Sequence, residues 1–149
     1  MKDLWGFNKL NKDDVSGTPH GILKEQADLF EKKTGDTLFI RMQTRKLRFD
    51  PDNDDFEFGL ATHFEIVAPA LDSYSYTLFT LYSKPERNYP VALEKNMNDK
   101  DELRDMVWER DEMDYRCTNE DTFVEALKEI LGSADTTDII KNLYSKSYI

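Results

Sequence analysis

The feature that most constrains the fold is an alternation of side chains between residues 56 and 68. Every second position there is apolar or threonine: Phe56, Phe58, Leu60, Thr62, Phe64, Ile66 and Ala68. A period of two places these side chains on one face of an extended strand, and such a strand has to pair with others in a sheet. The alternation therefore predicts a sheet with one buried face.

Three further segments have the composition of strands. They span residues 38–49, 74–83 and 89–95, and the Asp-rich segment 50–55 separates the first from the strand at 56–68. Pro90 restricts the last segment to a strand start or a sheet edge. Because the connections are short, neighbouring strands should be antiparallel, and we expect a four-stranded antiparallel meander.

Helical signals flank the predicted strands. Thr18 and Pro19 are typical of an N-cap and a first helical position, and Gly35 of a helix end, so a helix is predicted over 19–33. After the sheet we expect two to three helices packed on it: one over 98–113, one opened by the capping pattern at 118–121 and ended by Gly132, and one from about residue 136. The predicted class is α+β, with residues 1–149 as a single globular domain and 1–17 as an irregular N-terminal arm.

The first predicted strand changes its apolar face between Met42 and Leu47. A single β-bulge between these two residues would keep both side chains on the core face, opposite the alternating positions of the second strand. In that register Arg41 lies opposite His63. The pair falls on the sheet face away from the phenylalanine-rich side.

That face suggests one functional alternative, a small-molecule-binding or enzymatic site at Arg41, His63, Glu65 and Phe79. The histidine is able to move a proton, the glutamate to orient it, and the arginine to hold an anion. Leu81 joins Phe79 on the same predicted face and makes it less polar than a solvent face. A structural homodimer through Phe79 and Leu81 is therefore a further alternative.

The formal net charge is −10, from 30 acidic and 20 basic residues. Nucleic acids and anionic membranes would be repelled, so neither is expected as a partner, and the basic strand segment at Arg41, Arg45, Lys46 and Arg48 is expected to be balanced by nearby carboxylates. The N-terminal residues contain no apolar stretch of signal-peptide type, which together with the single cysteine favours a cytoplasmic protein. A basic protein is the partner that the charge favours.

The acidic charge gathers in the segment 94–114, where nine acidic residues stand against four basic ones. Met106 and Trp108 lie inside it, next to Glu109, Asp111 and Glu112. Aromatic side chains dominate binding energy at interfaces and charge guides encounter, so these five residues are the candidate binding surface. The leading expectation is a non-enzymatic protein-binding module. Its small, acidic, single-domain build resembles, in general type only, the bacterial immunity and antitoxin proteins that neutralise a basic partner.

No pattern in the chain predicts a cofactor or a metal. The aspartates of the 50–55 turn lack the glycine and the glutamate that a calcium loop requires. Cys117, His20 and His63 share no spacing typical of a zinc site. No phosphate-binding or dinucleotide-binding glycine motif occurs.

Overall fold

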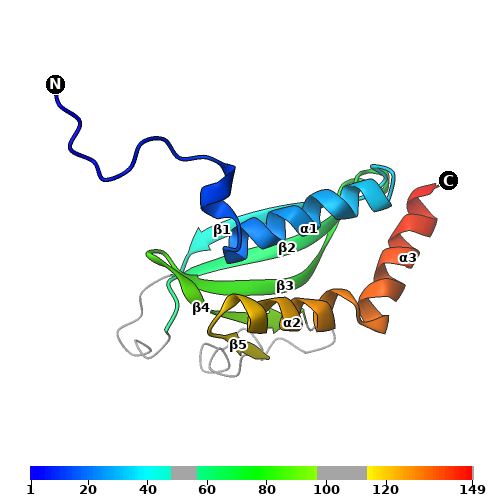
Figure 1. The fold of residues 1–149 in the computed structure, drawn as a ribbon. Coiled ribbons are helices and arrows are strands. Elements are labelled where there is room, and N and C mark those ends of the chain that lie inside the picture. Colours follow the sequence, from blue (N-terminus) through cyan, green and yellow to red (C-terminus); the bar gives the residue numbers. More distant parts are fainter. Residues whose placement is uncertain (48–56, 97–113, 149) are drawn as a thin grey trace.

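A computed structural model describes residues 1–47, 57–96 and 114–148 of the chain. In chain order the elements are the 3-10 helix η1 (Lys12–Val15), α1 (Pro19–Lys33), β1 (Phe39–Lys46), β2 (Leu60–Ala68), the 3-10 helix η3 (Pro69–Leu71), β3 (Tyr74–Lys84), β4 (Arg87–Lys95), β5 (Tyr115–Cys117), α2 (Glu120–Leu131) and α3 (Ala134–Tyr148) (Figure 1). The α+β class is confirmed. The sequence predicted four strands, and the described residues form five.

In the part of the chain that the structure describes, five strands form one sheet in the order β1-β2-β3-β4-β5, with every neighbouring pair antiparallel. The four predicted strands make the expected meander, and β5 pairs with β4 as a short edge strand. Tyr115–Cys117 has only three residues, too few for a two-residue period to stand out in the sequence. Within the described ranges, β1 and β5 are the two edges of the sheet.

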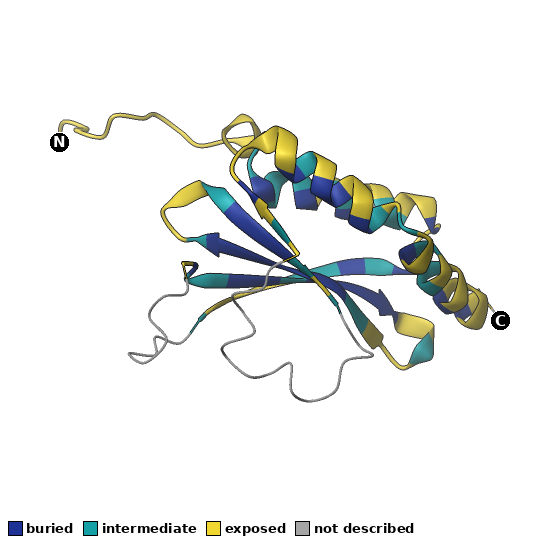
Figure 2. Ribbon diagram, turned by 90° about the horizontal axis from the view of Figure 1, so that it is seen from below, coloured by how far each residue is buried: buried dark blue, intermediate teal, exposed yellow. Residues whose placement is uncertain are grey.

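Helices α1 and α2 lie on one face of the sheet (Figures 1 and 2). Buried residues of all three α-helices join one core cluster with that face, including Leu23 and Ala27 of α1, Phe123 of α2 and Leu143 of α3. A second, smaller cluster on the opposite face contains Phe58, Ala61, Tyr82 and Ala92. The sheet therefore carries apolar side chains on both faces.

The helix boundaries follow from local capping. The side-chain oxygen of Thr18 accepts a hydrogen bond from the backbone N–H of Gly21, and Pro19 occupies the first helical position. Asn119 caps α2 through a reciprocal box with Thr122. These ends confirm the predicted helices over 19–33 and 118–132, whereas the predicted helix at 98–113 lies outside the described residues.

The predicted bulge in β1 is wrong. Pairing of β1 with β2 is unbroken from Phe39 to Lys46, and the backbone N–H of Leu47 extends it with a 2.8 Å hydrogen bond to the carbonyl of Gly59. Leu47 packs against the second cluster on the far face, so it needs no bulge to reach apolar surroundings. The true register pairs Arg41 with Glu65 and leaves Gln43 opposite His63.

A bulge occurs instead in β3. Phe64 is opposite Phe79 and Glu65 is opposite Thr77, so Leu78 is the extra residue. The shift turns Phe79 onto the helix-covered face, where its ring stacks on that of Phe64 with 4.7 Å between centroids and 15° between planes. Phe79 and Leu81 both have 0% exposure. Their predicted place on the face away from the phenylalanine-rich side is therefore wrong, and these two side chains offer no exposed surface for the homodimer contact that was based on them.

The first residues of the chain form an arm that extends away from the body (Figure 1). Trp5 and Phe7 are 77% and 50% exposed, and their ring centroids are 6.0 Å apart. At the base of the arm, Asn11 caps η1, and Tyr89 of β4 donates a hydrogen bond to the carbonyl of Gly17. The irregular arm of residues 1–17 thus includes one short 3-10 helix.

Candidate functional site

The leading predicted binding residues, Met106, Trp108, Glu109, Asp111 and Glu112, lie outside the described residues. The two flanks of the acidic segment 94–114 are described. At one flank the carboxylate of Asp114 accepts a 2.7 Å hydrogen bond from the backbone N–H of Lys95 at the other. The segment therefore leaves β4 and returns to β5 at one place on the molecule.

Two surface hollows meet at this place, and both are lined by Asp114 and by Glu129 of α2. The larger, here called the α2–α3 pocket, has a volume of about 630 Å³ and lies between the ends of β3 and β4, the C-terminal half of α2 and the start of α3. Its apolar lining comes from Tyr76, Leu78, Ile130 and Ile139, and its carboxylates from Asp114, Glu129, Asp135 and Asp138. It combines an apolar lining with an excess of negative charge.

The second hollow, here called the β5–α2 groove, has a volume of about 470 Å³. One wall is the consecutive run 114–117, and the other is α2, through Asp121, Thr122, Glu125, Ala126 and Glu129. Residues four apart on a helix lie on the same side. The α2 wall therefore carries a row of carboxylates at Asp121, Glu125 and Glu129.

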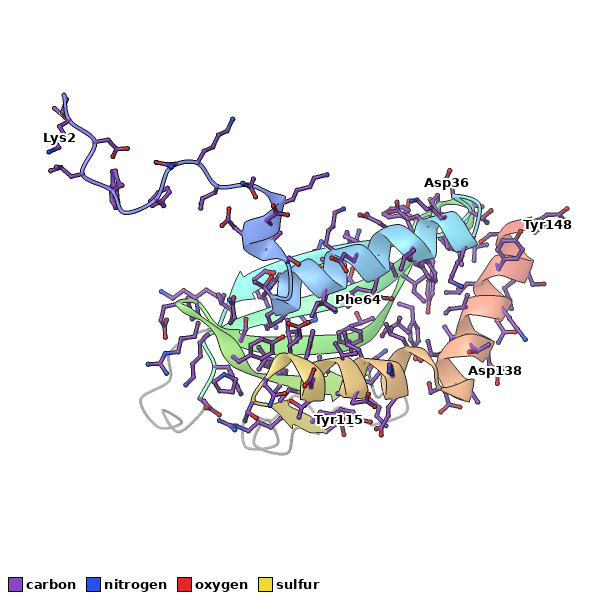
Figure 3. All side chains as sticks on the ribbon, in the orientation of Figure 1. Lys2, Asp36, Phe64, Tyr115, Asp138 and Tyr148 are labelled. Carbon is purple, nitrogen blue, oxygen red and sulfur yellow. The ribbon has the colours of Figure 1, made fainter. Side chains whose placement is uncertain are left out.

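Among the described residues, six carboxylates line the two hollows, and we call them together the acidic α2 surface: Asp114, Asp121, Glu125, Glu129, Asp135 and Asp138. Tyr115 lies beside α2, and Asp138 lies on α3 beyond the end of α2 (Figure 3). The α2 capping box sets where α2 begins, and the short link between the helices sets where α3 begins, so these features position the five carboxylates that lie on α2 and α3.

Several of the nearby cations have partners elsewhere or at the rim. Arg116 donates two hydrogen bonds, of 3.0 and 2.7 Å, to the carboxylate of Glu57, which also pairs with Lys84 at 3.4 Å. Lys128 reaches Glu125 at 3.4 Å in an exposed pair. Within the described residues, no ion pair involves Asp121, Asp135 or Asp138. The surface consequently keeps an excess of negative charge.

Tyr115 links the strand to the helix. Its hydroxyl donates a 2.6 Å hydrogen bond to Oε2 of Glu129, and this bond is the main reason why the pKa of Tyr115 is raised to about 12. The ammonium group of Lys95 lies 5.8 Å from the centre of the Tyr115 ring. Tyr115 therefore holds Glu129 beside the edge strand, between the two hollows.

The alternative site on the open sheet face is rearranged relative to the sequence prediction. The guanidinium of Arg41 donates hydrogen bonds of 2.6 and 3.0 Å to one carboxylate oxygen of Glu65, which neutralises the charge expected to hold an anion. His63 lies next to Thr80, with 3.1 Å between Nδ1 and Oγ1. Phe79 is on the other face. The predicted group of four is not brought together.

The surroundings of the two histidines and of the cysteine do not indicate a reactive centre. Burial, followed by the nearby charge of Arg45, lowers the pKa of His63. His20 is bonded to Thr62 at 3.0 Å, and burial lowers its pKa as well. Cys117 is buried, its thiol lies 3.7 Å from the carbonyl of Thr122, and burial raises its pKa, which disfavours the reactive thiolate.

In the three described ranges, no group of three or more histidine, cysteine, aspartate or glutamate side chains has the geometry to hold a metal ion. None of the helices in those ranges combines the length and apolar character needed to cross a bilayer.

Sequence reasoning missed the β5–α2 groove and the α2–α3 pocket. One signal was available, because Asp121, Glu125 and Glu129 recur every four residues in a segment that the sequence predicts to be helical. The strand wall was not predictable in the same way, since β5 was not expected. Comparison of the chain with protein-family models, with curated proteins and with solved structures gives no match.

Proposed function

We propose that this protein is a non-enzymatic protein-binding module that binds a basic protein through the acidic α2 surface. The observation that carries the proposal is that two adjacent hollows share Asp114 and Glu129, and that six carboxylates of the described residues line them. Lys95 and Arg116 also line the hollows, so the acidic residues are in excess and not alone. A concave surface with apolar lining and an excess of negative charge favours a basic partner, since the apolar lining supplies contact area and the charge supplies orientation. The two ends of the acidic segment 94–114 lie together beside these hollows, because Lys95 is hydrogen-bonded to Asp114. This position supports the same side of the molecule as the contact face.

Binding of this kind is compatible with neutralisation of a basic partner, in the general manner of bacterial immunity or antitoxin proteins. A catalytic or small-molecule role at Arg41, His63 and Glu65 has weaker support. Its arginine is already paired with its glutamate, and the lowered pKa of the histidine disfavours the cationic form near neutral pH.

The test is a charge-reversal experiment with a defined basic probe. We would measure binding of a fluorescein-labelled peptide of alternating lysine and valine by fluorescence anisotropy, at low and at high salt. The variant Glu125→Lys/Asp138→Lys changes one exposed carboxylate in each hollow. We expect its dissociation constant to rise about tenfold or more, and wild-type binding to weaken as salt screens the charges.

A matched control separates a site from a general charge effect. Glu25→Lys/Glu86→Lys makes the same change in net charge at two exposed positions, on α1 and in the β3–β4 turn. We expect this control to shift the dissociation constant by about twofold or less. Equal weakening by the two double variants, or no binding of the peptide to the wild-type protein, would contradict the proposal.

A further inference from the structure

The β5–α2 groove has the form of a site for strand addition. β5 pairs with β4 along one edge, through Tyr115 opposite Leu93, Arg116 opposite Ala92 and Cys117 opposite Val91. In an extended strand the backbone N–H and C=O groups point to both sides. No other strand of the described chain pairs with the outer side of β5.

The hollow follows the backbone of this edge. It is lined by four consecutive residues, 114–117, and consecutive side chains of a strand point to opposite faces. Only a groove that runs along the strand edge is bordered by all of them. Ala126 and Cys117, with 5% and 1% exposure, give it a shallow apolar lining next to the strand.

The opposite wall has a repeat that matches a strand. Four residues of an α-helix advance about 6 Å along its axis. Two residues of a β-strand advance about 6.4–6.8 Å. The carboxylates of Asp121, Glu125 and Glu129 therefore recur at nearly the distance at which every second side chain of an extended segment recurs.

We infer that the basic partner inserts an extended segment into the β5–α2 groove, where it adds to the sheet as a sixth strand beside β5. This inference rests on the proposed function and specifies the chemistry of the partner. Backbone hydrogen bonds to β5 give the segment its place, and lysine or arginine at alternating positions meets the carboxylate row of α2. The side chains at the positions between them point to the opposite face of the sheet, away from α2, so valine is suited to those positions.

The experiment compares two peptides of equal charge on the wild-type protein. The first is the alternating lysine–valine peptide, and the second has two of its central valines replaced by proline, which lacks the backbone donor and is poorly tolerated in a paired strand. We expect the proline peptide to bind about tenfold more weakly at the same salt concentration. We also expect amide hydrogen exchange at residues 114–118 to slow when the first peptide binds.

A groove-filling variant provides an independent measurement. Ala126→Leu adds volume at the groove wall without changing charge, and it should weaken binding of the lysine–valine peptide about fivefold or more, while urea unfolding reports whether the variant is folded. The peptide comparison on the wild-type protein does not depend on how this variant folds.

The outcomes distinguish the two proposals. Equal binding of both peptides, with loss of binding in Glu125→Lys/Asp138→Lys, would overturn strand addition and leave the proposed function standing. Binding of neither peptide would overturn both. A wild-type dimer in sedimentation velocity that dissociates in Ala126→Leu would also overturn the inference, because it would assign the groove to a second copy of the chain.

Discussion

Truncation of Phe79 to alanine tests which face of the sheet holds the main core. The ring has 0% exposure and stacks on Phe64 at 4.7 Å. Removal of a buried phenylalanine side chain destabilises a protein by about 3–5 kcal/mol, of which the aromatic pair accounts for about 0.5–1.5 kcal/mol. If the Phe79 ring were exposed to solvent, the loss would be about 0.5 kcal/mol.

The assay is urea unfolding followed by circular dichroism, at a pH near 7. With a slope of about 2 kcal/mol per molar urea, a loss of 4 kcal/mol moves the unfolding midpoint down by about 2 M. Tyr74→Ala is the matched control, since Tyr74 begins the same strand and is 49% exposed, and we expect it to lower the free energy of unfolding by less than about 1 kcal/mol.

If Phe79→Ala proves too unstable to purify, Phe79→Leu gives the same information on a smaller scale, with an expected loss of about 1–1.5 kcal/mol. A loss below about 1 kcal/mol in Phe79→Ala, at an unchanged slope, would refute the bulge at Leu78. It would show that the Phe79 ring does not belong to the main core.

Two further predictions concern α1. A Cβ atom added at Gly21 would collide with the backbone carbonyl oxygen of Val15, so Gly21→Ala should lower the free energy of unfolding by about 1–3 kcal/mol, although alanine favours helices. Gly6→Ala, with no atom nearby, should change nothing in the same urea unfolding measurement. Burial lowers the pKa of His20, so the unfolded chain binds more protons than the folded chain once the pH drops below about 6.5. The stability contributed by the neutral histidine should be complete above that pH and fall as the pH drops through the folded pKa. His20→Gln should flatten this dependence in urea unfolding, and NMR titration of the wild-type ring should give a pKa below 6.5.

The helices were predictable because their ends are encoded locally. The threonine and proline at 18 and 19, and the polar residues at 118–121, specify capping hydrogen bonds that involve only neighbours in the sequence. The meander was predictable for a related reason, since short connections leave few topologies for consecutive strands. Both kinds of inference depend on contacts close in sequence.

The register was not predictable, because it depends on contacts across the sheet. Leu78 and Phe79 are adjacent and both apolar, so β3 fits a period of two in either phase, and only the stacking of Phe79 on Phe64 selects one. Leu47 and Phe58 indicated one continuous apolar face, yet both pack in the second cluster on the far side of the sheet. The prediction assumed that only one face of the sheet is buried. Because both faces carry apolar side chains, the predicted pairing of β1 with β2 differs from the observed pairing by two residues.

Some carboxylates of this protein have a structural role, whereas others on the acidic α2 surface have none that the fold explains. Glu57 and Glu65 hold Arg116 and Arg41, and Glu129 holds Tyr115, so each of these carboxylates contributes to the structure. Asp121 and Asp135 lie in the first turns of α2 and α3, where negative charge stabilises a helix. Asp138 lies beyond the first turn of α3 and enters no ion pair within the described chain.

For Asp138, and for the exposed Glu125, the fold gives little or no compensation for bringing like charges together around two hollows. A carboxylate held at such a place raises the free energy of the isolated protein slightly, through repulsion from its neighbours. A basic partner would reverse the sign of that contribution. Replacement of Asp138 by asparagine should therefore leave the free protein as stable or slightly more stable, and weaken peptide binding, whereas a purely structural role would lower stability and leave binding unchanged.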